Sequence, residues 1–313
     1  VGALSSSSMF ASQAETYPDR PIKFVVPNPA GGLPDTVARV FAQKLSERLG
    51  QSVIVDNKPG ANGMIAAQTL INSPKDGYSF LVADGSMFSI NPHIYNTLSY
   101  NYKRDFLPVS LAASAPLYLA VHTRVKANSM KELISLIKSK PGEFAYGSSG
   151  IGSTHHLSME AFKSALSLDI THVPFKGTGQ SVPALIGGQV DMLFSALPAL
   201  AGFVKTGQAR LLGNNAARRS ALEPNVPSIS EIIPGYDFAP TIGVFATNGT
   251  PPSLIERLSI EVSKVAKLPE LIQTLGNAGV EAIGGSTAEH AKTIASENER
   301  FGKAVQAAGI KPE

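Results

Sequence analysis

The chain has 313 residues, of which 43% are hydrophobic and 16% are charged, and its formal net charge at pH 7 is +3. This length suggests about two domains of ordinary size with substantial cores. The sequence contains no cysteine, which excludes disulfides, thiolate metal sites and cysteine nucleophiles. Because no cluster of lysine or arginine interleaves with aromatic residues, nucleic-acid binding has little support.

The first residues resemble the end of an export signal. Residues 1–14 are small, mildly apolar and uncharged, and residues 11–14 (Ala-Ser-Gln-Ala) are similar to a small-x-small cleavage site, offset by one position. We predict that residues 1–16 are the remnant of a signal peptide or, alternatively, a flexible N-terminus. No uninterrupted apolar run of about 20 residues follows, so the mature chain is not expected to span a membrane.

The first third of the chain alternates short β-branched runs with amphipathic stretches. Strands are predicted at residues 22–26, 53–57 and 78–84, and helices at residues 36–49 and 62–71. Such alternation favours a parallel sheet that is covered by helices.

A second α/β set begins near residue 118, with no flexible joint before it. Its strands are predicted at residues 117–122, 144–148, 170–173, 190–194 and 210–214, with helices after Ser129 and at residues 154–165 and 179–186. A strand at 242–247 and helices at 252–266, 269–277 and 288–308 close the chain. We therefore expect an α/β fold of two lobes with a cleft between them, each lobe a mixed, mostly parallel sheet flanked by helices. Residues 17–117 with 238–313 would form the first lobe, and residues 118–237 the second.

Four of the predicted strands lead into loops that are rich in glycine and hydroxyl groups. These loops are residues 27–35, 84–92, 146–155 and 174–179. Ligands of open α/β sheets bind outside the carboxyl ends of the strands. Glycine allows the backbone to approach a ligand, and a helix start presents N–H groups that favour an anion. The pattern indicates an anion-binding cleft, although the first loop alone is equally compatible with an ordinary strand-to-helix turn.

No complete catalytic or metal-binding motif is present. Gly150-Ile-Gly152 begins like a dinucleotide loop, but His155 stands where the third glycine belongs. Adjacent helical residues do not share a face, which disfavours a metal site at His155 and His156. We expect no cofactor and no metal. The main enzymatic alternative is a serine hydrolase that uses Ser149 with His156.

A series of motifs resembles the substrate-binding proteins of tripartite tricarboxylate transporters, the Bug family. The first is Pro27-x-Pro-x-Gly-Gly-x-x-Asp35-x-x-Ala-Arg39. The others keep the family's order over roughly residues 17–313, at 58–63, 76–78, 90–92, 105–109, 146–153, 172–177, 185–191, 226–228 and 307–311. The resemblance implies a type II-like periplasmic binding protein, without catalytic activity, whose lobes close over a small carboxylate. It also implies a monomer, located in the periplasm after signal-peptide removal, that delivers the solute to membrane permease subunits.

The resemblance also implies which residues contact the ligand. The first loop would contribute Ala30, Gly31, Gly32 and Leu33, with Asp35 holding the turn, and the third loop Ser86. The second lobe would contribute Ser148, Ser149, Gly150 and Ser153 with His156 beside them, and another wall formed by Phe175, Lys176 and Gly177.

Four positions depart from the family pattern and bear on the substrate. Asn28 stands where an aromatic residue is frequent, and Met87 and Phe88 where hydroxyl or histidine side chains are common. Ser195 replaces a common aspartate that suits a ligand amine or hydroxyl. Loss of that charge would tolerate a second carboxylate, since like charges within about 4–6 Å repel. We therefore expect a dicarboxylate with an apolar middle, aromatic such as terephthalate or aliphatic such as adipate. The alternative is a monocarboxylate, with the apolar residues in the core.

Overall fold

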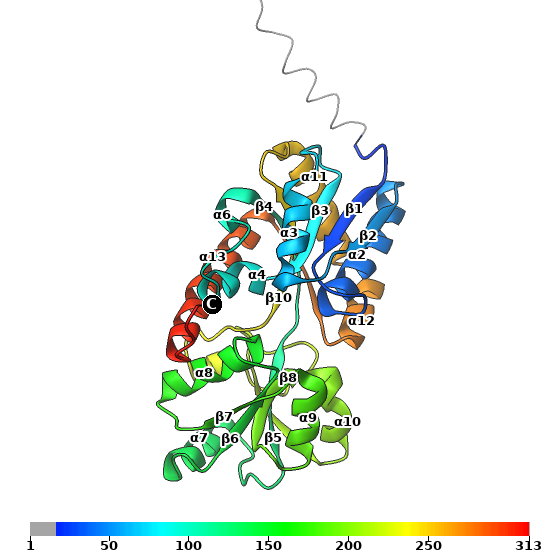
Figure 1. The fold of residues 1–313 in the computed structure, drawn as a ribbon. Coiled ribbons are helices and arrows are strands. Elements are labelled where there is room, and N and C mark those ends of the chain that lie inside the picture. The colour runs from blue at the N-terminus through cyan, green and yellow to red at the C-terminus, as the bar shows by residue number, and fades with distance from the viewer. Residues whose placement is uncertain (1–16, 313) are drawn as a thin grey trace, which may run out of the picture.

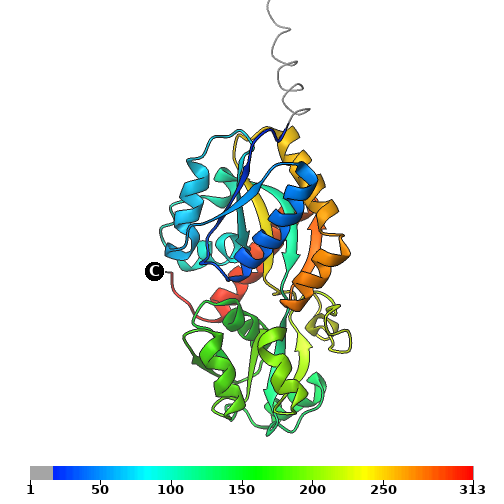
Figure 2. The ribbon, with the colours of Figure 1, turned by 90° about the vertical axis from the view of Figure 1, so that its right-hand side faces the viewer.

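The computed structural model describes residues 17–312, so the predicted signal-peptide remnant lies outside the described residues. The chain forms two α/β lobes, one above the other in Figure 1. In the view of Figure 2 the chain segments that connect the lobes cross between them.

The first lobe is built on a six-stranded sheet with the order β11-β4-β10-β3-β1-β2. Its strands are β1 (Ile22–Val26), β2 (Val53–Asn57), β3 (Ser79–Asp84), β4 (Phe106–Ser114), β10 (Thr241–Thr247) and β11 (Glu281–Gly285). Its helices are α2 (Leu33–Leu49), η1 (Ala61–Gly63), α3 (Met64–Ile71), α4 (Ser86–Ser89), α5 (Asn91–Ile94), α6 (Tyr102–Asp105), α11 (Pro252–Val265), α12 (Pro269–Asn277) and α13 (Thr287–Ala307).

The second lobe is built on a five-stranded sheet with the order β7-β6-β8-β5-β9. Its strands are β5 (Leu117–His122), β6 (Ala145–Ser148), β7 (Thr171–Pro174), β8 (Met192–Ala196) and β9 (Ala209–Asn214). Its helices are α7 (Met130–Ser139), α8 (Thr154–Leu166), α9 (Thr178–Ile186), α10 (Leu197–Lys205) and η2 (Ile229–Glu231).

The predicted α/β class with two mixed sheets is confirmed, but parallel pairing does not dominate either sheet. In the first lobe β1 is parallel to β2 and β3, whereas β10 is antiparallel to β3 and β4, and β11 is antiparallel to β4. In the second lobe β6 is parallel to β7 and β8, and β5 is antiparallel to β8 and β9. The reversed strands β5 and β10 follow the crossings between lobes, whereas the reversed strand β11 follows α12 within the first lobe. A strand that arrives from the other lobe needs no crossover helix and can enter the sheet in the reverse direction.

The predicted elements do not include β4, β11 and α10. Pro108 lies inside β4 and Pro198 lies in the first turn of α10. Proline removes a backbone donor, but it is tolerated at a bulge and at a helix start. The register of β10 against β4 does shift where Phe245 pairs with Pro108.

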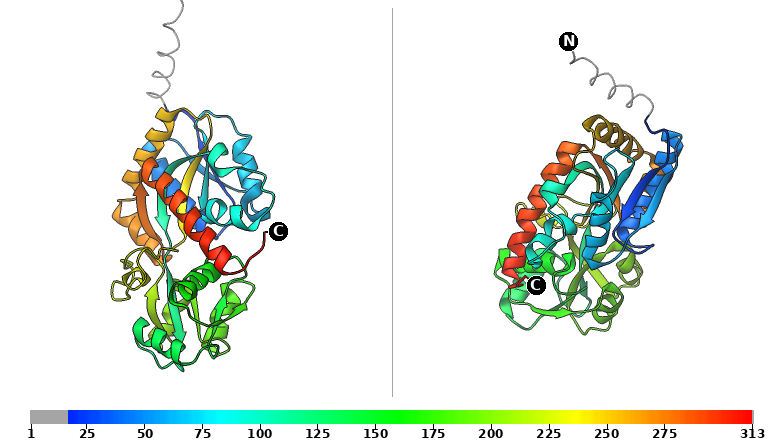
Figure 3. Two further views of the ribbon diagram at one scale, coloured as in Figure 1. Left: turned by 90° about the vertical axis from the view of Figure 1, so that its left-hand side faces the viewer. Right: turned by 45° about the horizontal axis from the view of Figure 1, so that its top comes forward.

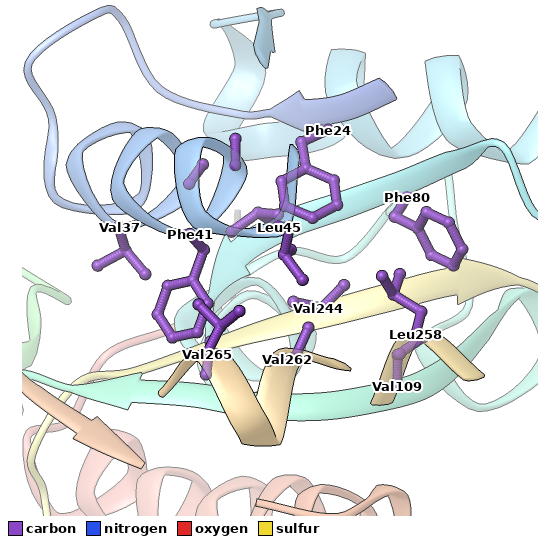
Figure 4. Close-up of a cluster of buried hydrophobic side chains, with 14 of the residues drawn as sticks. Phe24, Val37, Phe41, Leu45, Phe80, Val109, Val244, Leu258, Val262 and Val265 are labelled. Atoms are coloured by element: carbon purple, nitrogen blue, oxygen red, sulfur yellow. The ribbon is translucent and has the colours of Figure 1, made fainter. Parts of the chain in front are cut away.

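Alternating strand residues build a hydrophobic core on each side of the first sheet. Phe24 and Val26 of β1 face α2 and α11, whereas Val25 faces the other side, with α3. Figure 4 shows the first of these cores, in which Phe41 and Leu45 of α2 approach the valines of α11. This packing holds α2 against the sheet and so fixes the position of the loop that precedes it.

Helix α13 contacts both lobes. Figure 3 shows it running from the first lobe down to α8 of the second. Its residues Phe301, Ala304 and Val305 belong to the hydrophobic cluster of the second lobe, together with Phe162 of α8. The division of the chain at residues 117/118 and 237/238 stays a prediction, and α13 would be shared between the two lobes.

The fully buried side chain of Asn215 joins both segments that cross between the lobes. Its Oδ1 accepts a hydrogen bond from the backbone N–H of Leu117 at 2.8 Å, and its Nδ2 donates to the backbone oxygen of Phe238 at 2.8 Å. Nδ2 also donates to Oγ of Ser158 in α8 at 3.1 Å. One amide therefore connects the outgoing strand, the returning segment and the helix that follows β6.

We predict that Asn215→Ala destabilises the protein by more than about 2 kcal/mol, because it leaves buried backbone groups of Leu117 and Phe238 without partners. Urea unfolding measures the loss. The matched control is Asn96→Ala, which removes an exposed amide and should change stability by less than about 0.5 kcal/mol. Equal effects of the two substitutions would contradict this role of Asn215.

Candidate functional site

A cavity of about 530 Å³ lies between the lobes, at the end of the sheets where β1, β3 and β6 lead into loops. Both lobes contribute to its walls. The first lobe supplies residues 27–29, 59–63, 84, 86, 87, 90, 91, 94 and 95, and the second lobe supplies residues 149–154. This is the place where the sequence predicted a ligand-binding cleft.

Asp35 holds the first loop in shape. Its Oδ2 accepts hydrogen bonds from the N–H of Gly31 at 2.8 Å and from Nε of Arg39 at 3.0 Å, and its Oδ1 accepts from Nδ2 of Asn57 at 2.8 Å. Burial favours the neutral acid, but the hydrogen bonds from Arg39, Asn57 and Gly31 outweigh this effect and lower the pKa of the Asp35 carboxyl. The turn is therefore fixed by an ionised, buried carboxylate.

The two glycines of this loop serve the turn itself. Gly31 has a φ of +86°, which favours glycine, whereas Gly32 has a φ of −68° and caps α2. The N–H of Gly31 donates to Asp35, and that of Gly32 donates to the backbone oxygen of Pro29 at 3.1 Å. The cavity is lined by Pro27, Asn28 and Pro29 rather than by Ala30, Gly31, Gly32 and Leu33. A ligand-binding role for residues 30–33 stays a prediction.

The segment 59–63, absent from the predicted site, forms a second part of the wall. Ala61 and Asn62 both have positive φ angles, 46° and 47°, between Gly60 and Gly63. The backbone oxygen of Asn62 accepts from Nδ2 of the buried Asn91 at 2.9 Å. Residues 58–63 resemble a family motif, which is a signal for this segment, but it lacks the hydroxyl groups that marked the other loops.

The third loop places Ser86 and Met87 in the cavity wall together with Asp84. Contact of Ser86 and Met87 with a ligand stays a prediction. Oδ1 of Asp84 accepts from the N–H of Ser86 at 2.9 Å and also from the Ser86 hydroxyl. Phe88 was expected to contact the ligand, and this expectation is wrong. Its ring is buried, 4.1 Å from that of Phe245. Successive residues of a helical turn differ in direction by about 100°, so Phe88 in α4 points away from the wall that carries Ser86.

The second-lobe wall contains Ser149, Gly150 and Ser153, whose contact with a ligand stays a prediction, with Ile151, Gly152 and Thr154. Ser153 caps α8, since its Oγ accepts from the N–H of His156 at 3.2 Å and donates to the backbone oxygen of Gly150 at 2.7 Å. The first turn of α8 therefore lies at the cavity, where its backbone N–H groups and the helix dipole favour negative charge.

Ser148 and His156 lie behind this wall. Oγ of Ser148 is 2.7 Å from Nε2 of His172, and the rings of His156 and His172 stack at 4.0 Å. Nδ1 of His156 accepts from the N–H of Gly152 at 3.1 Å. Burial lowers the pKa of His156 to about 4 and also lowers that of His172. These neutral rings support the loop from beneath rather than lining the cavity.

The pairing of Ser149 with His156 is wrong. Oγ of Ser149 is 2.8 Å from Nδ1 of His155, the preceding residue. Burial lowers the pKa of His155 to about 4, which makes it a weak base at neutral pH. Among residues 17–312, no carboxylate is hydrogen-bonded to His155, so the group that orients the base in a catalytic triad is missing.

The remaining predicted residues do not line the cavity. Phe175 packs beside Gly147 and Val190, Lys176 is exposed, and Gly177 precedes α9 with a φ of 91°. Contacts of residues 175–177 with a ligand stay predictions.

Ser195 was expected to face the ligand, and in the structure it does not. It is fully buried in β8 opposite Tyr118 of β5, on the sheet face that α9 and α10 cover. Strand residues alternate between faces, and Ser195 shares its face with Leu193 of the core. The argument that Ser195 makes room for a second carboxylate therefore loses its geometric basis.

The cavity wall contains no lysine, arginine or histidine from residues 17–312, and Asp84 is its single charged residue. Within the same described range, no group of three or more histidine, aspartate and glutamate side chains is arranged to hold a metal ion. Nor does any helix there combine the length and apolar character needed to cross a membrane. An anion in this cavity would be held by backbone N–H groups and polar side chains.

A buried acid, Glu297 of α13, lies against the third loop. A side chain on Gly85 would collide with Oε2 of Glu297, and Oε1 accepts from Oγ1 of Thr241 at 2.8 Å. Burial raises the pKa of Glu297 to about 8, against the lowering effects of Thr241 and Arg300. Glu297 is therefore protonated at neutral pH and connects the cavity wall, α13 and the start of β10.

The raised pKa of Glu297 predicts a pH dependence of stability. The folded state keeps a proton on this carboxyl that the unfolded chain, with an ordinary pKa of 4.5, loses. The contribution of Glu297 is thus full below pH 4.5 and is lost as pH rises toward about 8. Glu297→Gln copies the neutral acid, so the Tm of the wild type should fall relative to this variant between pH 5 and pH 9. Glu299→Gln, an exposed change on the same helix, is the control. Parallel Tm curves for the wild type and Glu297→Gln would contradict the prediction.

Comparison with known proteins identifies the family. The family model described as the tripartite tricarboxylate transporter family receptor matches residues 37–310. Protein BugT of Bordetella pertussis is 32% identical over 300 residues, which cover 95% of this chain and 92% of BugT. The chain belongs to the tripartite tricarboxylate transporter receptor family. Members of this family are periplasmic solute-binding receptors and not enzymes, so the hydrolase alternative is wrong.

Two solved structures carry ligands. R. palustris Rpa4515 with adipate has 34% sequence identity and a TM-score of 0.77, and the match covers 95% of this chain and 100% of that one. MatC from Rhodopseudomonas palustris with bound malate has 27% identity and a TM-score of 0.71, with 92% and 100% covered. The predicted two-lobed fold of periplasmic binding proteins is confirmed by these similarities.

Proposed function

We propose that this receptor is exported, loses its signal peptide and closes its two lobes over a small organic carboxylate. It then delivers the solute, as a monomer, to the membrane permease subunits of a tripartite tricarboxylate-type transporter. The main support is the cavity between the lobes, where the N-terminal end of α8 faces the loops of the first lobe. Among residues 17–312, no lysine or arginine lines this cavity. Backbone N–H groups at a helix start bind anions without a cationic side chain.

Within this class we propose a dicarboxylate. The support is that adipate and malate, the ligands named for two structural relatives, are both diacids. Phe88 and Phe175 do not line the cavity. Its apolar wall is mostly aliphatic, with prolines, Ala61, Met87 and the isoleucines at 90, 94 and 151, and Tyr95 is its aromatic residue. An aliphatic diacid therefore suits this wall better than terephthalate. The competing class is a monocarboxylate.

A thermal-shift screen of mono- and dicarboxylates, followed by calorimetry, tests the carboxylate assignment. A ligand at about 100 times its Kd should stabilise the protein by about 2.7 kcal/mol if it binds only the folded state. The informative variants are at Ile151, which is 70% exposed and lines the cavity. Ile151→Glu places a negative charge beside the ligand and should weaken carboxylate binding at least tenfold relative to its neutral match, Ile151→Gln. Equal affinities for these two variants, or no binding of any carboxylate, would refute the proposal.

Lobe closure predicts a more compact protein in the presence of ligand. Contacts from both walls form together only when the lobes approach, so the ligand shifts the population toward the closed form. Small-angle X-ray scattering should show a smaller radius of gyration with a saturating carboxylate than without it. A radius that stays constant for a ligand with measured affinity would argue for a preformed site.

A further inference from the structure

We propose that Asp84 selects ligands that carry a hydrogen-bond donor, a hydroxyl or an amino group, in addition to their carboxylate. The inference rests on the proposed function, since it concerns the substrate class of the same cavity. It narrows the expected ligands from plain diacids such as adipate to hydroxylated or aminated acids.

The geometry of Asp84 leaves one carboxylate oxygen for the ligand. Asp84 is the last residue of β3 and is partly exposed in the cavity wall. Both donors of Ser86, its N–H and its hydroxyl, bind Oδ1 and fix the orientation of the carboxylate. Among residues 17–312, no group donates a hydrogen bond to Oδ2, and no lysine or arginine forms an ion pair with Asp84. A carboxylate oxygen accepts hydrogen bonds, so Oδ2 is available to a ligand that carries a donor.

A second hydrogen-bond acceptor in the first-lobe wall also lacks a donor. Oδ1 of Asn28 is buried and has no hydrogen-bond partner among the described residues. Asn28 lines the same cavity as Asp84. A buried acceptor that has lost water and has no partner is unfavourable, and a donor on the ligand would relieve this cost.

The two walls of the cavity therefore prefer opposite groups. The second-lobe wall, residues 149–154, contains the start of α8 and favours negative charge. The first-lobe wall contains Asp84, which repels a carboxylate within about 4–6 Å. A bound acid is thus oriented with one carboxylate toward α8 and a hydroxyl or amino group toward Asp84. A second carboxylate is accepted only where it stays away from Asp84.

Substitution of Asp84 by asparagine has a specific expected consequence. The Ser86 donors should retain the amide oxygen in the place of Oδ1, which turns the NH2 group into the cavity. Asp84→Asn therefore replaces an acceptor by a donor without changing the shape of the wall. The ligand preference of the Asp84→Asn variant should therefore reverse, toward acids that lack the hydroxyl or amino group.

Calorimetry on the whole mature protein tests this with matched acids: malate and aspartate against succinate, lactate against propionate, and 2-hydroxyadipate against adipate. For the pairs that bind, the wild type should favour the donor-bearing acid by roughly ten- to hundredfold, the range of a charged hydrogen bond. Asp84→Asn should reduce this ratio to about one or reverse it. Asp84→Ser, a smaller uncharged change, should also reduce it and serves if the asparagine variant is unstable.

Asp169→Asn is the matched control, because it removes an exposed aspartate charge from the second lobe outside the cavity wall. For Asp169→Asn, the ratio of the affinities for the donor-bearing acid and its matched acid should equal that of the wild type. If carboxylates bind to the wild type with no preference for donor-bearing acids, or if both Asp84 variants keep the preference, Asp84 is not the selecting residue although the receptor function stands. If no carboxylate in any pair binds, the proposed function itself fails, and this inference fails with it.

Discussion

The buried amide of Asn215 is the contact on which the arrangement of the two lobes depends. It binds the backbone of Leu117 on the outgoing strand and that of Phe238 on the returning segment, and its Nδ2 reaches Ser158 of α8. A single side chain thus fixes the second-lobe ends of both crossings relative to the helix that begins at the cavity. The shared helix α13 adds a second connection, because it packs on both lobes.

Two buried acids near the cavity illustrate how local donors decide the state of a carboxyl group. Asp35 is ionised because Arg39, Asn57 and the N–H of Gly31 stabilise its charge. Glu297 is buried with one donor, Thr241, and keeps its proton. The first acid shapes the loop at residues 27–35, and the second fills the space behind residue 85. Both support the cavity wall without adding a free charge to it, so its polarity follows from Asp84 and the start of α8.

The sequence predicted those features that depend on local patterns. The loop after residues 22–26 and the helix at residues 154–165 follow from short motifs, and Ser149 and Ser86, named from such motifs as ligand-binding residues, lie in the cavity wall. The remaining features depend on contacts between distant residues. Nothing near Asn215 indicates that it binds residues 98 and 23 positions away. Phe88 and Ser195 sit next to recognisable motifs, but the side on which each side chain lies follows from the turn of α4 and the pleat of β8, which a motif does not specify.

The two walls of the cavity offer different kinds of groups to a ligand. In the second lobe, the hydroxyls of Ser148, Ser149 and Ser153 contact His172, His155 and the backbone of Gly150, and the N–H groups of Gly150, Gly152 and Ser153 also donate within the lobe. The proposed carboxylate would meet the remaining N–H groups of the loop and of the first turn of α8. Backbone groups recognise a carboxylate but carry little information about the rest of the molecule. In the first lobe, the side chains of Asn28, Asp84 and Asn91 line the wall instead. The second lobe is therefore suited to bind the group that all carboxylates share, while substitutions in the first lobe can change the substrate without disturbing that contact.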